Sequence, residues 1–264
     1  MQPLPTRING PVAVIGDVHG HVKKLLTILE KLQSLPDFEQ RWLVFIGDFV
    51  DRGPDSKETL DVVIDLLTEH PRTTAIAGNH ELAMAASLDL VRTPDYSNWT
   101  ERWLEYHDAK LTFESYGAEF GNLEELRDLM PGSHQEFLAG LPWCVEHPRF
   151  LFVHAGLDPN TPFGLQLRIL QQKDCSLNRP QWLCSKALID ADVPPDCPVT
   201  VVSGHVPVPK VIFRPQRILI DTTGGIEGDL SCVLLPEKQI LTSDAKAAIV
   251  ASPAEQSRAW WKLW

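Results

Sequence analysis

The residues best suited to chemistry lie in three short boxes, residues 16–20, 47–53 and 78–81, whose first glycines are 31 residues apart. Each box places Asp, Asn or His directly after an apolar run typical of a strand. Two later boxes repeat this pattern and supply His154 and His205. Open α/β sheets bind ligands at the carboxyl ends of their strands. Five expected strand ends therefore bring polar side chains to one rim.

The donors in these boxes are oxygen and imidazole groups with no thiolate, the mixture that hard to borderline divalent metals prefer. A carboxylate such as Asp48 can bridge two ions. Two cations about 3.5–4 Å apart can hold a bridging hydroxide and clamp an in-line displacement at phosphorus. We therefore expect two divalent metals that hydrolyse phosphate esters, with six donors: Asp17, His19, Asp48, Asn79, His154 and His205. The alternative, that each box only caps a helix or satisfies a loop, is disfavoured because five boxes follow in order.

The boxes resemble the signature of the phosphoprotein phosphatase family of metallophosphoesterases, which reads GDxHG, GDxVDRG, GNHE, HAG and GH. The resemblance implies a first metal on Asp17, His19 and Asp48. It implies a second metal on four residues, Asp48, Asn79, His154 and His205. Manganese is the ion we expect, with iron or zinc as alternatives.

The same resemblance gives catalytic roles to residues beside the ligands. Arg52, together with Asn79, would bind the substrate phosphate, and His80 would protonate the leaving oxygen while Asp51 orients it. These roles also suit the side chains, because a guanidinium offers paired planar donors to phosphate. A histidine backed by a carboxylate is a tunable acid near neutral pH.

The sequence departs from the family at a second phosphate-binding arginine, since Trp182-Leu183 is followed by Cys184. Either Arg168, Arg179 or Lys186 replaces it, or Arg52 and the metals suffice. Residues 221–225, Asp-Thr-Thr-Gly-Gly, resemble bacterial-type members and the symmetrical dinucleoside tetraphosphatases.

Three functions remain open. We expect a hydrolase, a metal-dependent protein phosphatase that cleaves phosphomonoesters of phosphoproteins (Ser/Thr or Tyr) or a small phosphate ester. The intact Asp51-Arg52-Gly53 and Glu81 favour it. The alternative is a symmetrical bis(5′-nucleosyl)-tetraphosphatase-like hydrolase. A non-catalytic scaffold of the same fold is less favoured, because no ligand is missing.

The elements that must position these residues alternate between strand and helix. Strands are expected at 12–15, 42–46, 73–77, 150–153 and 199–202. Val22, Leu25, Leu26, Leu29 and Leu32 recur at helical spacing, and a second helix with a capping box begins at Asp55. From residue 217, short alternating runs read as antiparallel strands. We expect an α/β fold, an αββα sandwich of two mixed sheets flanked by helices, of the calcineurin-like type.

The chain is expected to form a single domain over residues 1–264, with a helical cap insertion at about 82–148 and a short aromatic tail at about 253–264. Trp99, Trp103 and Tyr106 in the cap are expected in its core because of their helical spacing. Five histidines outside the boxes are expected at the surface or in the core: His21, His70, His107, His134 and His147.

Composition restricts the partners. The net charge of −11 argues against nucleic acid, which requires a basic stripe. The sequence shows no secretion signal, and no apolar run approaches the roughly 18 residues of a membrane span. We therefore expect no membrane partner and a cytoplasmic protein. The five cysteines are odd in number and lack CxxC spacing, so we expect reduced thiols.

Overall fold

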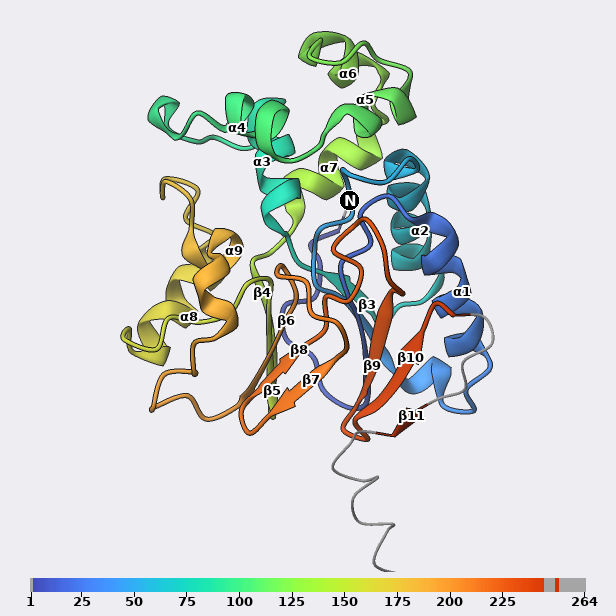
Figure 1. Ribbon diagram of the computed structural model, residues 1–264, viewed down its shortest axis with the longest axis vertical. Coiled ribbons are helices and arrows are strands. Elements are labelled where there is room, and N and C mark those ends of the chain that lie inside the picture. The colour runs from blue at the N-terminus through green and yellow to red at the C-terminus, as the bar shows by residue number, and fades with distance from the viewer. Residues whose placement is uncertain (1, 245–249, 252–264) are drawn as a thin grey trace, which may run out of the picture.

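Two β-sheets lie face to face in the computed structural model, which describes residues 2–244 and 250–251. Figure 1 shows α1 (Val22–Gln33) and α2 (Ser56–Glu69) along one side of the sheets, and α8 (Phe163–Gln172) and α9 (Gln181–Cys184) on the other. The remaining helices sit above the sheets at one end. The expected αββα sandwich is confirmed.

The first sheet has the order β11-β10-β9-β1-β2-β3. Strands β1, β2 and β3 are parallel, as βα units require, and β9, β10 and β11 are antiparallel to their neighbours. Its strands are β1 (Val12–Ile15), β2 (Trp42–Phe45), β3 (Thr73–Ala75), β9 (Ser231–Leu235), β10 (Gln239–Thr242) and β11 (Val250–Ala251).

The second sheet has the order β4-β5-β6-β8-β7. Strands β5, β6 and β8 are parallel, and β4 and β7 close the edges in antiparallel pairing. Its strands are β4 (Cys144–His147), β5 (Phe150–Val153), β6 (Thr200–Ser203), β7 (Ile212–Arg214) and β8 (Arg217–Leu219).

The helices between β3 and β4 are α3 (Asn79–Ser87), α4 (Trp99–Tyr106), α5 (Lys110–Tyr116), α6 (Leu123–Leu129) and α7 (Gly132–Gly140). Single turns of 3-10 helix lie at η1 (Phe38–Gln40), η2 (Asp95–Ser97) and η3 (Lys186–Ile189). No described helix is long and apolar enough to cross a membrane.

Alternation of side chains along the strands builds two apolar layers. Val12, Val14 and Val44 point between the sheets and meet Phe152 and Val202 of the second sheet. Residues of the opposite parity, such as Ala13, Ile15 and Phe45, pack with the helices in a separate larger cluster. Both faces of each central strand are therefore buried, which fixes the register and the position of every strand end.

Local details differ from the sequence predictions. Leu26, which was expected in the buried stripe of α1, is 39% exposed, and Ile28 is buried instead. The buried residues of this helix are Val22, Leu25, Ile28, Leu29 and Leu32. Asp55 is the N-cap of α2 but makes no side-chain capping bond, so the expected capping box is absent.

The expected cap range, 82–148, contains more than helices. Its helices end at Gly140, and residues 144–147 form β4 of the second sheet because they pair with β5. The cap boundary and the single-domain division remain proposals. The expected aromatic tail, 253–264, lies outside the described residues.

Candidate active site

The six predicted metal donors lie in loops that leave strands at one end of the two sheets. Asp17 and His19 follow β1, Asp48 follows β2, and His154 follows β5. Asn79 begins α3 after β3, and His205 follows β6. All six side chains are buried, with exposures of 9% or less. The structure therefore brings together the donors that the sequence placed at strand ends.

Several of these residues have left-handed backbones although they are not glycine. The φ angles are 46° at His19, 55° at Asp48 and 69° at His205, and Asp51 and Arg52 have 70° and 66°. Each such residue costs about 1–3 kcal/mol, and such strain gathers at functional sites. The surrounding fold must therefore supply the free energy that holds these loops.

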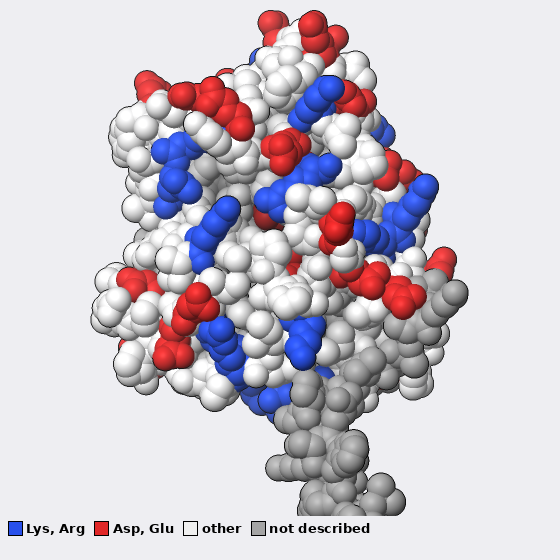
Figure 2. Space-filling model, viewed as in Figure 1, with Lys and Arg blue, Asp and Glu red and all other residues white. Residues whose placement is uncertain are grey.

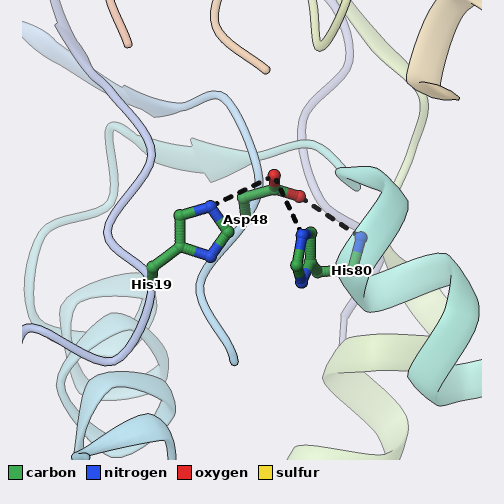
Figure 3. Close-up of side chains that lie close together, drawn as sticks. All are labelled: His19, Asp48 and His80. Atoms are coloured by element: carbon green, nitrogen blue, oxygen red, sulfur yellow. Dashed lines mark hydrogen bonds and ion pairs between the residues drawn. The ribbon is translucent and has the colours of Figure 1, made fainter. Parts of the chain in front are cut away.

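Asp48 lies between the imidazoles. Its Oδ2 is 3.4 Å from His19 Nε2 and 3.3 Å from His154 Nε2. Figure 3 shows His19 and His80 approaching this carboxylate from two sides. Two groups of ligand atoms share Asp48, one with His19 and His80 and the other with His154 and His205. This is the position expected of a carboxylate that bridges two ions.

Backbone carbonyls orient two of the imidazoles. His19 Nδ1 is 2.9 Å from the Val50 carbonyl, and His154 Nδ1 is 2.7 Å from the Ile46 carbonyl. A carbonyl only accepts hydrogen bonds, so each Nδ1 carries the proton and each Nε2 faces Asp48. Metal-ligating histidines are commonly oriented by such outer bonds.

Buried polar atoms without a partner show where a cation would fit. Asp17 Oδ1 and both ring nitrogens of His205 are buried and have no hydrogen-bond partner. Leaving such groups unpaired is costly in a protein interior. A divalent metal would satisfy them, because carboxylate oxygen and neutral imidazole are its ordinary ligands. The donor set therefore fits metal ions.

The electrostatics agree with this fit. Burial lowers the pKa of His205 to about 3, with the charge of His154 acting in the same direction. Burial also acts to lower the pKa of His154, but the charge of Asp48 outweighs it and raises that pKa to about 10. Asp17 has a raised pKa because of its burial and the nearby charge of Asp221. Such closely packed acids call for a compensating positive charge.

The first predicted ligand set differs in detail from the geometry. His80, rather than Asp17, is grouped with His19 and Asp48. Asp17 instead accepts a hydrogen bond of 2.9 Å from the backbone N–H of His205, through Oδ2. Asn79 Oδ1 lies 3.2 Å from His154 Nε2. The predicted ligand assignments therefore remain proposals, with Asp17 Oδ1 free to contribute.

Glu81 holds the loop that carries Asp48. Its carboxylate accepts backbone hydrogen bonds from Asp48 and Phe49, each at 2.7 Å, and from Gly78 at 2.9 Å. Burial, together with the charge of Asp48, raises the pKa of Glu81 to about 7. In the sequence Glu81 is recognisable only as the last residue of the GNHE motif, and its support of the loop becomes visible in the fold.

Asp51 and His80 form a hydrogen-bonded pair. His80 Nδ1 lies 2.7 Å from Asp51 Oδ2. Two cap side chains complete the carboxylate, Trp103 Nε1 at 2.9 Å from Oδ2 and the Thr112 hydroxyl at 2.7 Å from Oδ1. The Thr112 hydroxyl also accepts the backbone N–H of Asp51 at 2.9 Å. Burial raises the pKa of Asp51 to about 6, and these two donors oppose that rise.

Arg52 points its guanidinium at the imidazoles. Nη1 is 3.1 Å from His19 Nε2, and Nη2 is 3.2 Å from His80 Nε2. A guanidinium only donates, so His80 Nε2 accepts and His80 Nδ1 donates to Asp51. Nη1 also donates to the Gly224 carbonyl at 2.7 Å. The arginine is thus held with Nη1 and Nη2 both directed toward the place where the oxygens of a phosphate would lie.

A cavity of about 560 Å³ opens onto this cluster. Arg52, Asn79, His80 and His205 line it, together with Trp99, Arg102, Tyr106 and His107 of the cap. Of the three predicted arginine substitutes, Arg179 and Lys186 line the cavity, beside Cys184. Arg168 lies in α8 and does not line it.

Two expectations about aromatic residues need correction. His107 belongs to the site, because its ring packs edge to face on His80 with centroids 4.6 Å apart. Tyr106 is 73% exposed and lines the cavity, whereas Trp99 and Trp103 are buried as expected. Helical spacing could not separate these positions, because α4 presents one face to the core and another to the cavity.

Asp221 is a further acid at the rim that sequence reasoning passed over. It is buried, and its Oδ2 has no partner in the described structure. Burial raises its pKa, and its carboxylate receives the backbone N–H of Gly224 at 2.9 Å. Its position just after the strand at 217–219 was the available signal, because it repeats the strand-end pattern of the other donors.

Comparison with known proteins places the fold and these residues in a family. Residues 10–228 match the calcineurin-like phosphoesterase family, and the chain belongs to it. Members depend on a dinuclear metal centre. The family resemblance, the fold and the hydrolase class expected from the sequence are therefore supported together.

Similar curated proteins are protein phosphatases. The chain is 28% identical to the serine/threonine-protein phosphatase SIT4 of Candida albicans over 167 residues, 62% of this chain and 45% of that protein. It is 40% identical to the serine/threonine-protein phosphatase 4 catalytic subunit of Eremothecium gossypii over 77 residues, 29% and 24% of the two chains. The matched region thus spans less than half of these relatives.

Solved structures share the fold at low identity. A cold-active protein tyrosine phosphatase has a TM-score of 0.60 at 19% identity, covering 95% of this chain and 81% of that one. A "putative diadenosine tetraphosphatase" also has 0.60 at 19%, covering 91% and 97%. At 19% identity, these likenesses show the fold alone.

Proposed function

We propose that this chain is a metal-dependent phosphatase that hydrolyses phosphomonoesters of phosphoproteins. One observation carries the proposal: Asp48 Oδ2 lies within 3.4 Å of His19 and His154, beside Arg52 and the Asp51–His80 pair. Phosphate ester hydrolysis needs these three parts together at one end of a cavity. They are metal donors that share a carboxylate, a cation that binds phosphate, and an imidazole that is hydrogen-bonded to a second carboxylate. The phosphatase relatives support the same reading.

The metals would be held by Asp17, His19 and Asp48 on one side and by Asp48, Asn79, His154 and His205 on the other. When bound, two such ions activate water and neutralise charge on the reacting phosphate. We propose manganese, with iron or zinc as alternatives, because the donors include no thiolate.

The chain's own residues supply the other parts of the reaction. Arg52 would turn its two donor edges from the imidazoles to the phosphate oxygens, where charge-assisted bonds are strong. His80 would then be free to carry a proton on Nε2 and deliver it to the leaving oxygen. Asp51 keeps that ring in place through Nδ1. Such proton transfer contributes about 10²- to 10⁴-fold in rate.

Lys186 is our proposed substitute for the missing second arginine at the reacting phosphate. It lines the cavity, and its charge contributes to lowering the pKa of His205. A lysine serves as a point charge rather than a planar fork. The resulting site would tolerate phosphoserine, phosphothreonine, phosphotyrosine or a small ester.

The cytoplasm is the proposed location. The five cysteines are all unpaired, as expected of a reducing compartment. Three of them, Cys144, Cys197 and Cys232, are buried, and burial raises the pKa of each thiol. They are therefore poor nucleophiles and packing residues.

Substrate choice tests the proposal. With manganese added, purified protein should hydrolyse phosphoserine, phosphothreonine or phosphotyrosine peptides faster than diadenosine tetraphosphate at equal concentration. A preference for the dinucleotide by about tenfold or more would move the chain to the tetraphosphatase alternative. No turnover of any of these or of p-nitrophenyl phosphate, with metals bound, would favour the non-catalytic scaffold.

A further inference from the structure

Two arginines from distant segments share the cavity wall. Arg102 lies in α4 of the cap, and Arg179 lies just before α9. The lining carries four cationic side chains, with Arg52 and Lys186 added to these two, against the single carboxylate of Glu101. The whole chain has a net charge of −11. The positive lining therefore runs against the overall charge of the protein.

The two arginines converge at Cys184. Burial raises the pKa of the Cys184 thiol to about 12, and both Arg179 and Arg102 act on it in the opposite direction. A neutral thiol leaves a guanidinium with unused donors. Both arginines thus lie close to one point of the cavity.

Neither arginine is neutralised. Within the described parts of the chain, no carboxylate lies within 4.0 Å of Arg102 or Arg179, whereas Arg41 and Arg127 have such partners. Arg179 has a left-handed backbone, with φ of 55°. A residue with a side chain is strained in that conformation.

Basic side chains lie around a hollow on one face of the molecule. Figure 2 views the face with the hollow between the cap and the segment below it, and Lys and Arg side chains appear on both of its sides. The reacting phosphate would lie at the Arg52 and His80 end of the same cavity. One bound molecule can therefore place its phosphate at Arg52 and a second anionic group at Arg102 and Arg179.

We propose that Arg102 and Arg179 form a second anion subsite that selects peptides with an acidic side chain near the phosphorylated residue. This inference rests on the proposed phosphatase function and adds a substrate class to it. Planar guanidinium groups match the paired oxygens of a carboxylate or a second phosphate. Glu101 would repel an acidic side chain, but Arg102 and Arg179 outnumber it in the lining, so the net preference is acidic.

Binding of phosphonate peptides tests the subsite without turnover. Peptides with an uncleavable phosphonate in place of phosphoserine, flanked by Glu, Ala or Lys, are titrated into metal-loaded protein by calorimetry. We expect Glu-flanked peptide to bind about threefold or more tightly than the Ala-flanked one, the effect of two part-exposed ion pairs. In the double variant Arg102→Gln, Arg179→Gln this ratio should fall to about one.

Two further variants keep the result specific. Arg72→Gln, Arg168→Gln removes the same two charges from residues outside this cavity and should keep the ratio. Arg102→Lys, Arg179→Lys keeps the charge and should restore part of the preference. Equal affinity for all three peptides in the wild type would overturn the subsite, as would an unchanged ratio in the Gln variant.

The assay separates this inference from the proposed function. If p-nitrophenyl phosphate and phosphopeptides are not hydrolysed, the phosphatase proposal fails while the calorimetric ratio still decides the subsite. If hydrolysis is observed and the ratio is one, only the subsite fails.

Discussion

The indole N–H of Trp103 donates a 2.9 Å hydrogen bond to Asp51 Oδ2, the same oxygen that lies 2.7 Å from His80 Nδ1. The indole comes from the cap and the carboxylate from the loop after β2. A buried carboxylate held by such donors keeps its charge and its direction. The cap therefore takes part in orienting the proposed acid.

Removing this donor tests that role. Trp103→Phe keeps an aromatic ring in the core and deletes the N–H, so Asp51 loses one charge-assisted bond. We expect hydrolysis of a phosphoserine peptide to fall about tenfold, since such bonds contribute about 1.5–3 kcal/mol. Tyr116→Phe is the matched control, because it deletes a cap hydrogen bond to His134 that lies away from Asp51. Equal losses in the two variants would show a purely structural effect.

A second prediction concerns Asp48. Replacing Asp48 by Asn keeps its shape but removes the charge shared by the two groups of donors. Metal content and phosphatase activity should fall together, from two ions per chain toward none. Elemental analysis of the purified variant measures the first and p-nitrophenyl phosphate hydrolysis the second. Full metal content in active Asp48→Asn protein would show that another carboxylate bridges the ions.

The third prediction separates proton transfer from metal binding. His80→Ala should lose about 10²-fold or more on phosphoserine, because its alkoxide leaving group needs a proton. The loss on p-nitrophenyl phosphate should be much smaller, because p-nitrophenolate leaves unprotonated. The ratio of the two losses is the measurement. A matching loss on both substrates would assign His80 to positioning or to metal binding, as its place beside His19 and Asp48 allows.

Gly225 gives a fourth prediction. A Cβ on Gly225 would lie 2.6 Å from Arg52 Cδ and 2.7 Å from the His19 ring, and its φ is 69°. Gly225→Ala should therefore displace both side chains and weaken substrate and metal binding. Gly117→Ala is the control, because Gly117 has a similar φ of 81° with nothing within 4 Å. If the collision with Arg52 and His19 causes the loss, activity should fall in Gly225→Ala and persist in Gly117→Ala. If backbone strain causes it, activity should fall in both variants.

The fifth prediction uses pH. His134 is buried between Tyr116 and Asp61, at 2.7 Å and 2.9 Å, and burial lowers its pKa from the ordinary 6.5. The unfolded chain then binds more protons than the folded one below pH 6.5. The stability that neutral His134 provides is complete above pH 6.5 and is lost as pH falls through its lowered folded pKa.

Melting temperatures at pH 7.5 and 5.5 measure this dependence. His134→Gln should be less stable than the wild type at pH 7.5 but should lose less on acidification. The remaining histidines are common to both proteins and cancel in the comparison. An equal drop in the two proteins would contradict the assignment.

The sequence predicted the parts of the fold that depend on local pattern. Strands 12–15 and 150–153 match the structure at both ends, and the donors at strand ends converge because parallel strands end at one edge. Leu26 was misplaced because both Leu26 and Ile28 fit a helical apolar stripe, and only the packing of α1 shows that Ile28 is the buried one.

The residues that sequence analysis missed act across long separations. Thr112 and Trp103 reach Asp51 from positions 61 and 52 residues away. Glu81 supports four backbone amides, of which those of Asp48, Phe49 and Val50 lie more than 30 residues earlier. Contacts between residues so far apart leave no periodic pattern in the sequence. They can therefore be recognised only in the folded structure.

The bonds from Trp103 and Thr112 to Asp51 also limit how far the cap can be exchanged. A cap grafted from another family member would change the substrate cavity but would also remove the indole and the hydroxyl that hold Asp51. A functional chimera would have to carry equivalent donors at the same two points. Evolution of new substrate preference in this protein is therefore constrained to cap residues that line the cavity without bonding to Asp51, such as Arg102 and Tyr106.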